Sequence, residues 1–304
     1  MTAQKLSEKA VKNRYDFVLV FDVTDGNPNG DPDAGNMPRL DPETMHGFVT
    51  DVALKRKVRD YVEALKRNEP PYRIYVQHQS RGGTFLNALH DAAHDAAGTP
   101  KAERKAPPAD KREAAREWMC ENFFDVRAFG AVMTTGTNAG QVRGPLQLTF
   151  ARSVDPVAPA EVTITRVAKT TEARAEKEGT TEIGRKNIVP YGLYVAHGFV
   201  SPSFAAQTGF SDDDLALFWQ ALLRMFEDDR SAARGFMATR ALVLFKHDSP
   251  LGNAPAHELF DRVRISRKPG VEVARRYQDY DVEIASDVPT GVTIIQPRPE
   301  YGPD

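Results

Sequence analysis

The sequence predicts an α+β protein in which helices are layered on a β-sheet. Apolar runs with the alternation of strands recur along the chain and are separated by single helical patterns, an arrangement that favours this class. The 304 residues, of which 41% are hydrophobic and 27% charged, suffice for one large domain or two with a buried core. No internal repeat of roughly 20–50 residues is evident, so a solenoid is not expected.

The chain is organised around a strand, a long glycine-rich loop and a helix. Residues 14–24 are apolar on both faces in their middle, as in a central strand. The loop ends at Thr50, a residue suited to cap the helix that follows. One stripe of that helix is apolar and consists of Leu54, Val58, Tyr61 and Leu65. The opposite side is basic and consists of Lys55, Arg56, Arg59, Lys66 and Arg67.

The remaining elements alternate between strand and helix. Strands are predicted over 72–79, 123–133, near 146–152, over 234–248 and in two short late segments, and helices over 84–97 and 110–122. A second glycine-rich loop occupies 134–145. Ser211 and Asp214 are spaced as the capping box of a helix over 211–226.

Residues 161–191 differ from the rest of the chain. Two strand-like flanks enclose a middle with almost no large apolar side chain, and such a middle cannot pack as core. The segment suits either a projecting hairpin or a disordered surface loop. Basic residues gather near its base: Arg166, Lys169, Arg185 and Lys186.

Composition limits the classes of function. The formal net charge is −2, so any site for a polyanion must be a local patch. Cys120 is the only cysteine, which excludes an internal disulfide and a cysteine-based zinc site, and we expect a core thiol in a cytoplasmic protein. The start of the sequence has no signal-peptide pattern, and no run of about 18 apolar residues is present, so no membrane association is expected.

Several motifs could in principle supply a metal site or a catalytic site. Asp25, Asn27, Asn29 and Gly30 match the opening of a calcium loop, but Asn36 stands where the glutamate belongs. His90 and His94 have the spacing of a metal-ligand pair, although an exposed polar helix face is the preferred interpretation. The aspartates of loop 25–41 leave a metal-dependent ribonuclease open as the alternative function. Motifs for nucleotide hydrolysis or hydride transfer are absent.

Nucleic-acid binding is the hypothesis that unites the largest number of features. Glycine loops at 24–47 and 134–145, the basic helix face and the basic-rooted arm could together line a groove. Glycine brings backbone N–H groups close to phosphates, and lysine and arginine neutralise their charge.

Six stretches carry a resemblance to a known family. They are RYDFVLVFDVTDGNPNGDPDAGNMPRLDPET, HGFVTDVALKRKVRDYV, GQVRGPLQLTFARSVDP, ITR with TTE, GRKNIVPYGLYVAHGF and FKHDSPLGNAPAHELFD. Distributed over about residues 14–265, they resemble the crRNA-binding backbone subunit of the type I-C CRISPR interference complex, Cascade. Met45 departs from the pattern, which has a glycine there, and the arm at 169–183 is short.

The resemblance implies a single hand-shaped unit over 14–304. Its palm would be a modified RRM-like (ferredoxin-like) fold, with helical fingers at 81–122, a β-hairpin thumb at 163–188 and the palm itself at 14–80, 123–162 and 189–290. Copies would stack head to tail along the crRNA and leave most bases free to pair with a target DNA strand. The other implied partners are the large, small and repeat-processing Cascade subunits. No catalytic residue, metal or cofactor is implied.

The same resemblance, with the local composition, gives the expected RNA contacts. Sequence-independent binding requires contacts to sugar and phosphate rather than to base edges. The expected residues are Asn27, Asn29, Arg39 and His46 in the first loop, Lys55, Arg56 and Arg59 in the first helix, Gln141 and Arg143 in the second loop, and Arg166, Arg185 and Lys186 at the thumb root.

Overall fold

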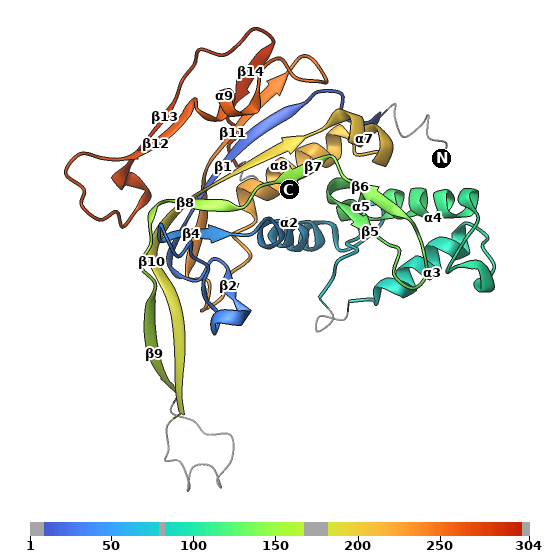
Figure 1. Cartoon of the computed structure of the whole chain (residues 1–304), viewed down its shortest axis with the longest axis horizontal. Coiled ribbons are helices and arrows are strands. Elements are labelled where there is room, and N and C mark those ends of the chain that lie inside the picture. The colour runs from blue at the N-terminus through green and yellow to red at the C-terminus, as the bar shows by residue number, and fades with distance from the viewer. Residues whose placement is uncertain (1–8, 79–82, 167–181, 300–304) are drawn as a thin grey trace, which may run out of the picture.

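A computed structural model describes residues 9–78, 83–166 and 182–299, and its centre is one antiparallel sheet of eight strands (Figure 1). The order across the sheet is β14-β11-β1-β10-β8-β4, with β7 and β9 also paired to β10. The strands are β1 (Tyr15–Gly26), β4 (His46–Val49), β7 (Leu146–Leu148), β8 (Ala151–Pro156), β9 (Ala160–Arg166), β10 (Glu182–Val200), β11 (Phe236–His247) and β14 (Val292–Ile295). The expected α+β class is therefore confirmed as a mixed α/β fold with a large antiparallel sheet.

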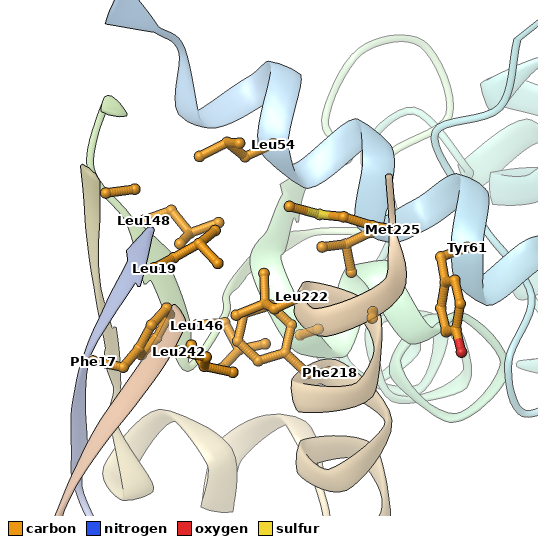
Figure 2. Close-up of a cluster of buried hydrophobic side chains, with 14 of the residues drawn as sticks. Phe17, Leu19, Leu54, Tyr61, Leu146, Leu148, Phe218, Leu222, Met225 and Leu242 are labelled. Carbon is orange, nitrogen blue, oxygen red and sulfur yellow. The ribbon is translucent and has the colours of Figure 1, made fainter. Parts of the chain in front are cut away.

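Both faces of the central strand β1 are buried, because its alternating side chains enter different clusters. Phe17 and Leu19 pack under α2 (Asp51–Lys66) and α8 (Asp212–Arg224) (Figure 2), and Phe21 belongs to the same cluster. Val18 and Val20 face the other cluster, which the C-terminal segments cover. Those segments are α9 (Ala256–Phe260), β12 (Val263–Arg267), η4 (Tyr277–Asp279) and β13 (Tyr280–Ile284).

A helical lobe with its own apolar cluster lies beside the sheet (Figure 1). It contains α3 (Leu86–Ala96), η3 (Lys101–Glu103), α4 (Ala109–Asn122), α5 (Phe124–Phe129), β5 (Gly130–Val132) and β6 (Gln141–Arg143). The short helix α7 (Pro202–Thr208) follows β10. Cys120 is buried in this lobe, which confirms the core thiol, and burial raises its pKa to about 12.

The predicted helix caps are confirmed. The Thr50 hydroxyl accepts a hydrogen bond from Ala53 N, and Ser211 and Asp214 form the capping box of α8. Such caps satisfy N–H groups that a helix leaves without partners in its first turn. They are local features, which explains why sequence spacing alone located them.

The strand predicted over 72–79 is wrong, and of the strand predicted over 123–133 only Gly130–Val132 (β5) is a strand. Residues 72–78 form an irregular segment outside the sheet, with bends at Tyr75 and Val76, whose N–H groups donate to the Asp125 carboxylate at 2.7 Å and 3.1 Å in place of a neighbouring strand. Residues 124–129 form the helix α5. A short apolar run fits a buried helix as well as a buried strand, so its composition did not decide between the two.

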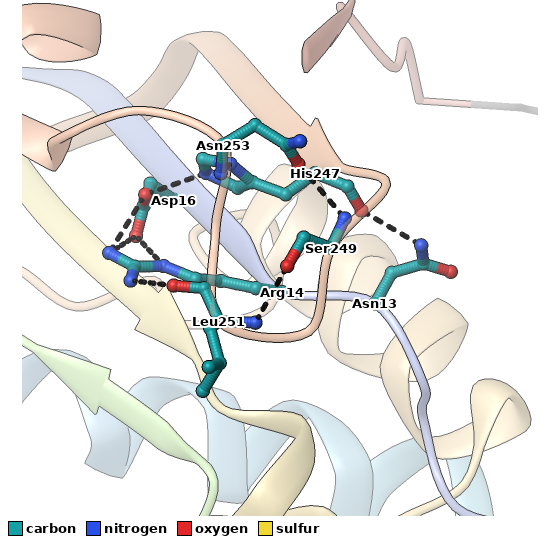
Figure 3. A network of polar contacts seen from close by, with 7 residues as sticks. All are labelled: Asn13, Arg14, Asp16, His247, Ser249, Leu251 and Asn253. Carbon is teal, nitrogen blue, oxygen red and sulfur yellow. Dashed lines mark hydrogen bonds and ion pairs between the residues drawn. The ribbon is translucent and has the colours of Figure 1, made fainter. Parts of the chain in front are cut away.

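A buried polar network fixes the connection after β11 (Figure 3). His247 Nε2 donates to the Asp16 carboxylate at 2.9 Å, and its Nδ1 accepts Asn253 N at 2.8 Å. Arg14 also binds Asp16, at 3.2 Å. Each buried polar group in this set has a partner, so the loop at 248–253 is held against the first strand.

Candidate nucleic-acid interface

The first glycine loop folds into a small hairpin. Strand β2 (Gly30–Asp31) pairs with β3 (Met37–Pro38), and η1 (Pro32–Ala34) makes the turn between them. A Cβ at Gly30 would lie 1.9 Å from Asn36 Oδ1, so any other residue there would displace the Asn36 side chain. Asn36 itself has a positive φ of 62°, a conformation that asparagine tolerates better than most residues.

The two asparagines of this loop have internal partners. Asn27 Nδ2 donates to Asn36 O at 2.7 Å, while its Oδ1 is buried and accepts no hydrogen bond from the described residues. Asn29 Oδ1 accepts both Thr50 N, at 3.0 Å, and Thr50 Oγ1, at 3.1 Å. Asn29 therefore ties the hairpin to the first turn of α2.

A polar cavity of about 350 Å³ lies where this hairpin meets α2 and the segment before β11. Three cationic side chains line it, namely Arg56, Lys57 and Arg234. Lys57 is buried and ion-paired with Asp229, which Arg234 also contacts at 2.8 Å. Burial, followed by the charge of Arg234, lowers the pKa of Lys57. Sequence analysis missed Lys57 and Arg234, because the former lies between the two predicted faces of α2 and the latter comes from a distant segment.

The basic face of α2 is only partly exposed. Arg56 is half-buried, pairs with Asp60 at 2.8 Å and donates to Val76 O at 3.3 Å. Lys55 pairs with Asp51 at 2.8 Å. The placement of Arg59 on a face opposite the buried stripe is wrong, since it is 8% exposed and its Nε donates to Asp125 at 2.7 Å.

Arg59 is buried because α2 packs on two sides, against the sheet and against the helical lobe. The Arg59 guanidinium lies 5.2 Å from the centre of the Phe129 ring, so the helical lobe covers the face that the sequence left to solvent. The apolar stripe is also shifted, because Val62 is buried while Leu65 is exposed.

Arg39 and His46 lie at the two ends of the segment that joins β3 and β4. Arg39 pairs with Asp31 at 3.4 Å. His46 Nδ1 donates to Ser153 O at 2.7 Å, which orients the ring beside β8. Met45 has a positive φ of 58°, so it occupies the backbone conformation for which a glycine was expected.

The second glycine loop does not join the first in one site. Gln141 and Arg143 lie on β6, beyond the other end of α2 from β2 (Figure 1). Both side chains are exposed, and the Arg143 guanidinium lies 4.4 Å from the centre of the Phe204 ring. They line a separate polar cavity of about 440 Å³ with residues of α4 and α7.

The arm is a hairpin at its base, where β9 pairs with β10. Arg185 is exposed and pairs with Glu161 at 3.2 Å, and Lys186 Nζ donates to Ala232 O at 3.2 Å. Arg166 lies opposite Glu182 in the register. The middle of the expected thumb, 167–181, lies outside the described residues.

Within the described ranges, no three histidine, cysteine, aspartate or glutamate side chains converge. Asp31 and Asp33 are engaged in the turn, since the Asp31 side chain accepts Asp33 N at 3.1 Å. The expected exposed histidine face is wrong. His90 and His94 are buried and contact the carbonyls of Thr137 and Asn138, both at 2.8 Å, so they hold the second glycine loop.

No described helix has the length and apolarity needed to cross a bilayer.

Comparison with known proteins gives the family. A family model described as CRISPR-associated protein Cas7 matches residues 13–285. A CRISPR-associated protein Cas7 of Haloferax volcanii is 28% identical over 233 residues, which cover 69% of this chain and 64% of that protein. A chain of a CRISPR RNA-guided surveillance complex, pre-nicking, is similar with a TM-score of 0.46 and 14% identity over 76% of this chain and 78% of that one. A chain of a second CRISPR RNA-guided surveillance complex is similar with a TM-score of 0.45 and 16% identity, over 81% of this chain and 74% of that one. Because the family model spans most of its length, the chain belongs to the Cas7 family.

Proposed function

We propose that this chain is the crRNA-binding backbone subunit of a type I-C Cascade. It binds the guide through sugar and phosphate, oligomerises head to tail along it and presents the bases to a target DNA strand. The observation that carries the proposal is the cationic cavity between the first glycine hairpin and α2, in a chain of the Cas7 family.

The chemistry of this cavity suits a phosphate. Arg56 and Arg234 bring guanidinium groups to its lining, while Lys57 stays buried in its ion pair with Asp229 and Gly30 lets the backbone approach closely. Contacts of this kind ignore base identity, which a guide of variable sequence requires. Arg59 supports the interface from inside, because its guanidinium is committed to Asp125.

The remaining contacts extend along the surface. We assign sugar or phosphate contacts to Asn27 and Asn29, which line the cavity. We assign them also to Arg39 and His46 at the ends of the segment between β3 and β4, to Lys55 on α2, to Gln141 and Arg143 in the second loop, and to Arg166, Arg185 and Lys186 at the thumb root. In the hand-shaped arrangement the sheet is the RRM-like palm, the lobe around α3 and α4 the fingers, and the β9–β10 hairpin the base of the thumb. The large, small and repeat-processing subunits are its other partners, in the cytoplasm.

We also propose that the chain is not an enzyme. The test measures binding and cleavage on the same samples, with two single-stranded RNAs of unrelated sequence, over a series of salt concentrations and with magnesium present. Equal affinities that fall with salt, without cleavage, support the backbone role. Magnesium-dependent cleavage that is lost in Asp31→Ala or Asp33→Ala would replace it with the ribonuclease alternative.

A further inference from the structure

The edge of the sheet carries an alternating set of aromatic and basic side chains on its outer face. Strand β4 is the last strand of the sheet and pairs with β8, so that Phe48 lies opposite Arg152. Gly47 and Val49 are buried, and the alternation of the strand leaves the partly exposed His46 and Phe48 on the outer face. On β8, Ala151 is buried and Arg152 is exposed, and Phe150 precedes the strand two residues before Arg152.

The two aromatic rings of this face are stacked on each other. Phe48 and Phe150 have ring centroids 6.0 Å apart and planes that differ by 4°. Phe150 is 49% exposed, and Phe48 is its single aromatic neighbour within the described chain. A phenylalanine that packs into a core is normally buried, so Phe150, supported by the half-buried ring of Phe48, presents flat apolar surface to solvent.

Arg152 is placed to bind a phosphate next to these rings. Its side chain is 60% exposed, and its ion pair with Asp41 is long, at 3.4 Å. Exposed pairs of this kind contribute little to stability. The Asp41 carboxylate also accepts Glu43 N at 3.1 Å and Thr44 N at 3.4 Å, so it keeps partners when Arg152 turns away.

We propose that Phe48 and Phe150 form a stacking platform for one unstacked nucleobase of the bound strand, and that Arg152 binds the phosphate next to that base. Every base has a flat π-face, so stacking tolerates any guide sequence, whereas hydrogen bonds to base edges would not. The platform rests on the proposed nucleic-acid function and adds to it a contact to the bases themselves. A cation beside a stacked aromatic pair favours a nucleotide over an apolar side chain from a second copy of the chain, since an apolar side chain offers Arg152 no anion.

The experiment compares two short oligonucleotides of equal length, one an ordinary single-stranded RNA and one abasic at every position, each long enough for one copy of the protein. Fluorescence anisotropy gives the affinity of each for the wild-type chain and for Phe150→Ala, Phe150→Trp and Arg152→Gln. Phe85→Ala is the matched control, because Phe85 is 74% exposed and lies at the start of α3. Light scattering without RNA compares the masses of the wild-type chain and Phe150→Ala.

Phe150→Ala should weaken binding of the ordinary RNA by roughly fivefold or more, the usual loss for one base–aromatic stack, and leave the abasic strand unchanged. Phe150→Trp should keep the wild-type affinity for the ordinary RNA. Arg152→Gln should lower the affinity for both strands, and Phe85→Ala should change the affinity for neither. Equal losses on both strands in Phe150→Ala, or no loss, would overturn the platform while the backbone function stands. A reduced mass of Phe150→Ala without RNA would assign the rings to a contact between copies and also overturn it. If the wild-type chain binds neither strand, the proposed function fails together with the platform.

Discussion

The buried carboxylate of Asp125 ties together the elements behind the candidate nucleic-acid interface, and replacing it tests whether Arg59 has a structural role. Its Oδ1 accepts Tyr75 N at 2.7 Å, and its Oδ2 accepts Arg59 Nε at 2.7 Å and Val76 N at 3.1 Å. The residue is 1% exposed. One carboxylate thus joins α2, the segment 72–78 and α5. In Asp125→Asn the shape is kept, but in either orientation the amide NH₂ faces a donor.

The magnitude follows from these contacts. Breaking a buried ion pair by removing one partner costs about 3–5 kcal/mol, because the other charge stays buried. A buried N–H that loses its acceptor adds about 1–3 kcal/mol, although the terms do not sum within one network. We therefore expect Asp125→Asn to lower the free energy of unfolding by about 3 kcal/mol or more.

Urea denaturation followed by tryptophan fluorescence measures this change, since Trp118 packs against the lobe cluster and Trp219 against the main core. The control is Glu161→Gln, which removes the exposed partner of Arg185 and should cost less than about 1 kcal/mol. A loss in Asp125→Asn no larger than that of the control, with an unchanged urea dependence, would refute the reasoning. Arg59 would then be available to RNA after all.

Three further predictions concern single residues. Met45→Gly should raise stability by up to about 1 kcal/mol in urea denaturation, because it relieves the positive φ of 58° at a cost in chain entropy; a loss of stability would contradict this. Arg56→Gln should weaken RNA binding and reduce the slope of log affinity against log salt by about 0.7, with the unfolding midpoint unchanged; an unaltered slope would remove Arg56 from the phosphate contacts. Cys120 has its pKa raised by burial to about 12, so the unfolded thiol ionises first and the native protein should lose stability as pH rises above about 9. Iodoacetamide labelling followed by mass spectrometry should accordingly modify Cys120 only after denaturation, and labelling of the native chain would contradict its burial.

Sequence patterns predicted the elements that depend on contacts between residues close together in the chain. The stretch around Phe17, Leu19 and Phe21 predicted a central strand, because a strand with apolar side chains on both faces is normally covered on both faces. Thr50 and Ser211 marked helix starts, since their hydroxyls satisfy neighbouring N–H groups. The glycine-rich loop was also located, but not the hairpin of β2 and β3 into which it folds.

Long-range contacts decided what the sequence could not predict. Tyr75 N finds its acceptor 50 residues away in Asp125, so its segment alternates like a strand yet pairs with no strand of the sheet. Arg59 was assigned to solvent because nothing in the helix itself shows that Phe129 packs over it. Arg234 enters the cavity from a separate segment. For the edge aromatics a signal did exist: His46 and Phe48, like Phe150 and Arg152, are two residues apart and share a face.

The central claim is that copies of this chain assemble on RNA without reading its sequence. Size-exclusion chromatography with light scattering, on the protein alone and with guide-length RNAs of unrelated sequence, tests it most directly. The account predicts a nucleoprotein particle whose mass rises with RNA length, is the same for each sequence and falls with added salt. A protein whose mass is unchanged by RNA, or one that assembles on a single sequence, would contradict it.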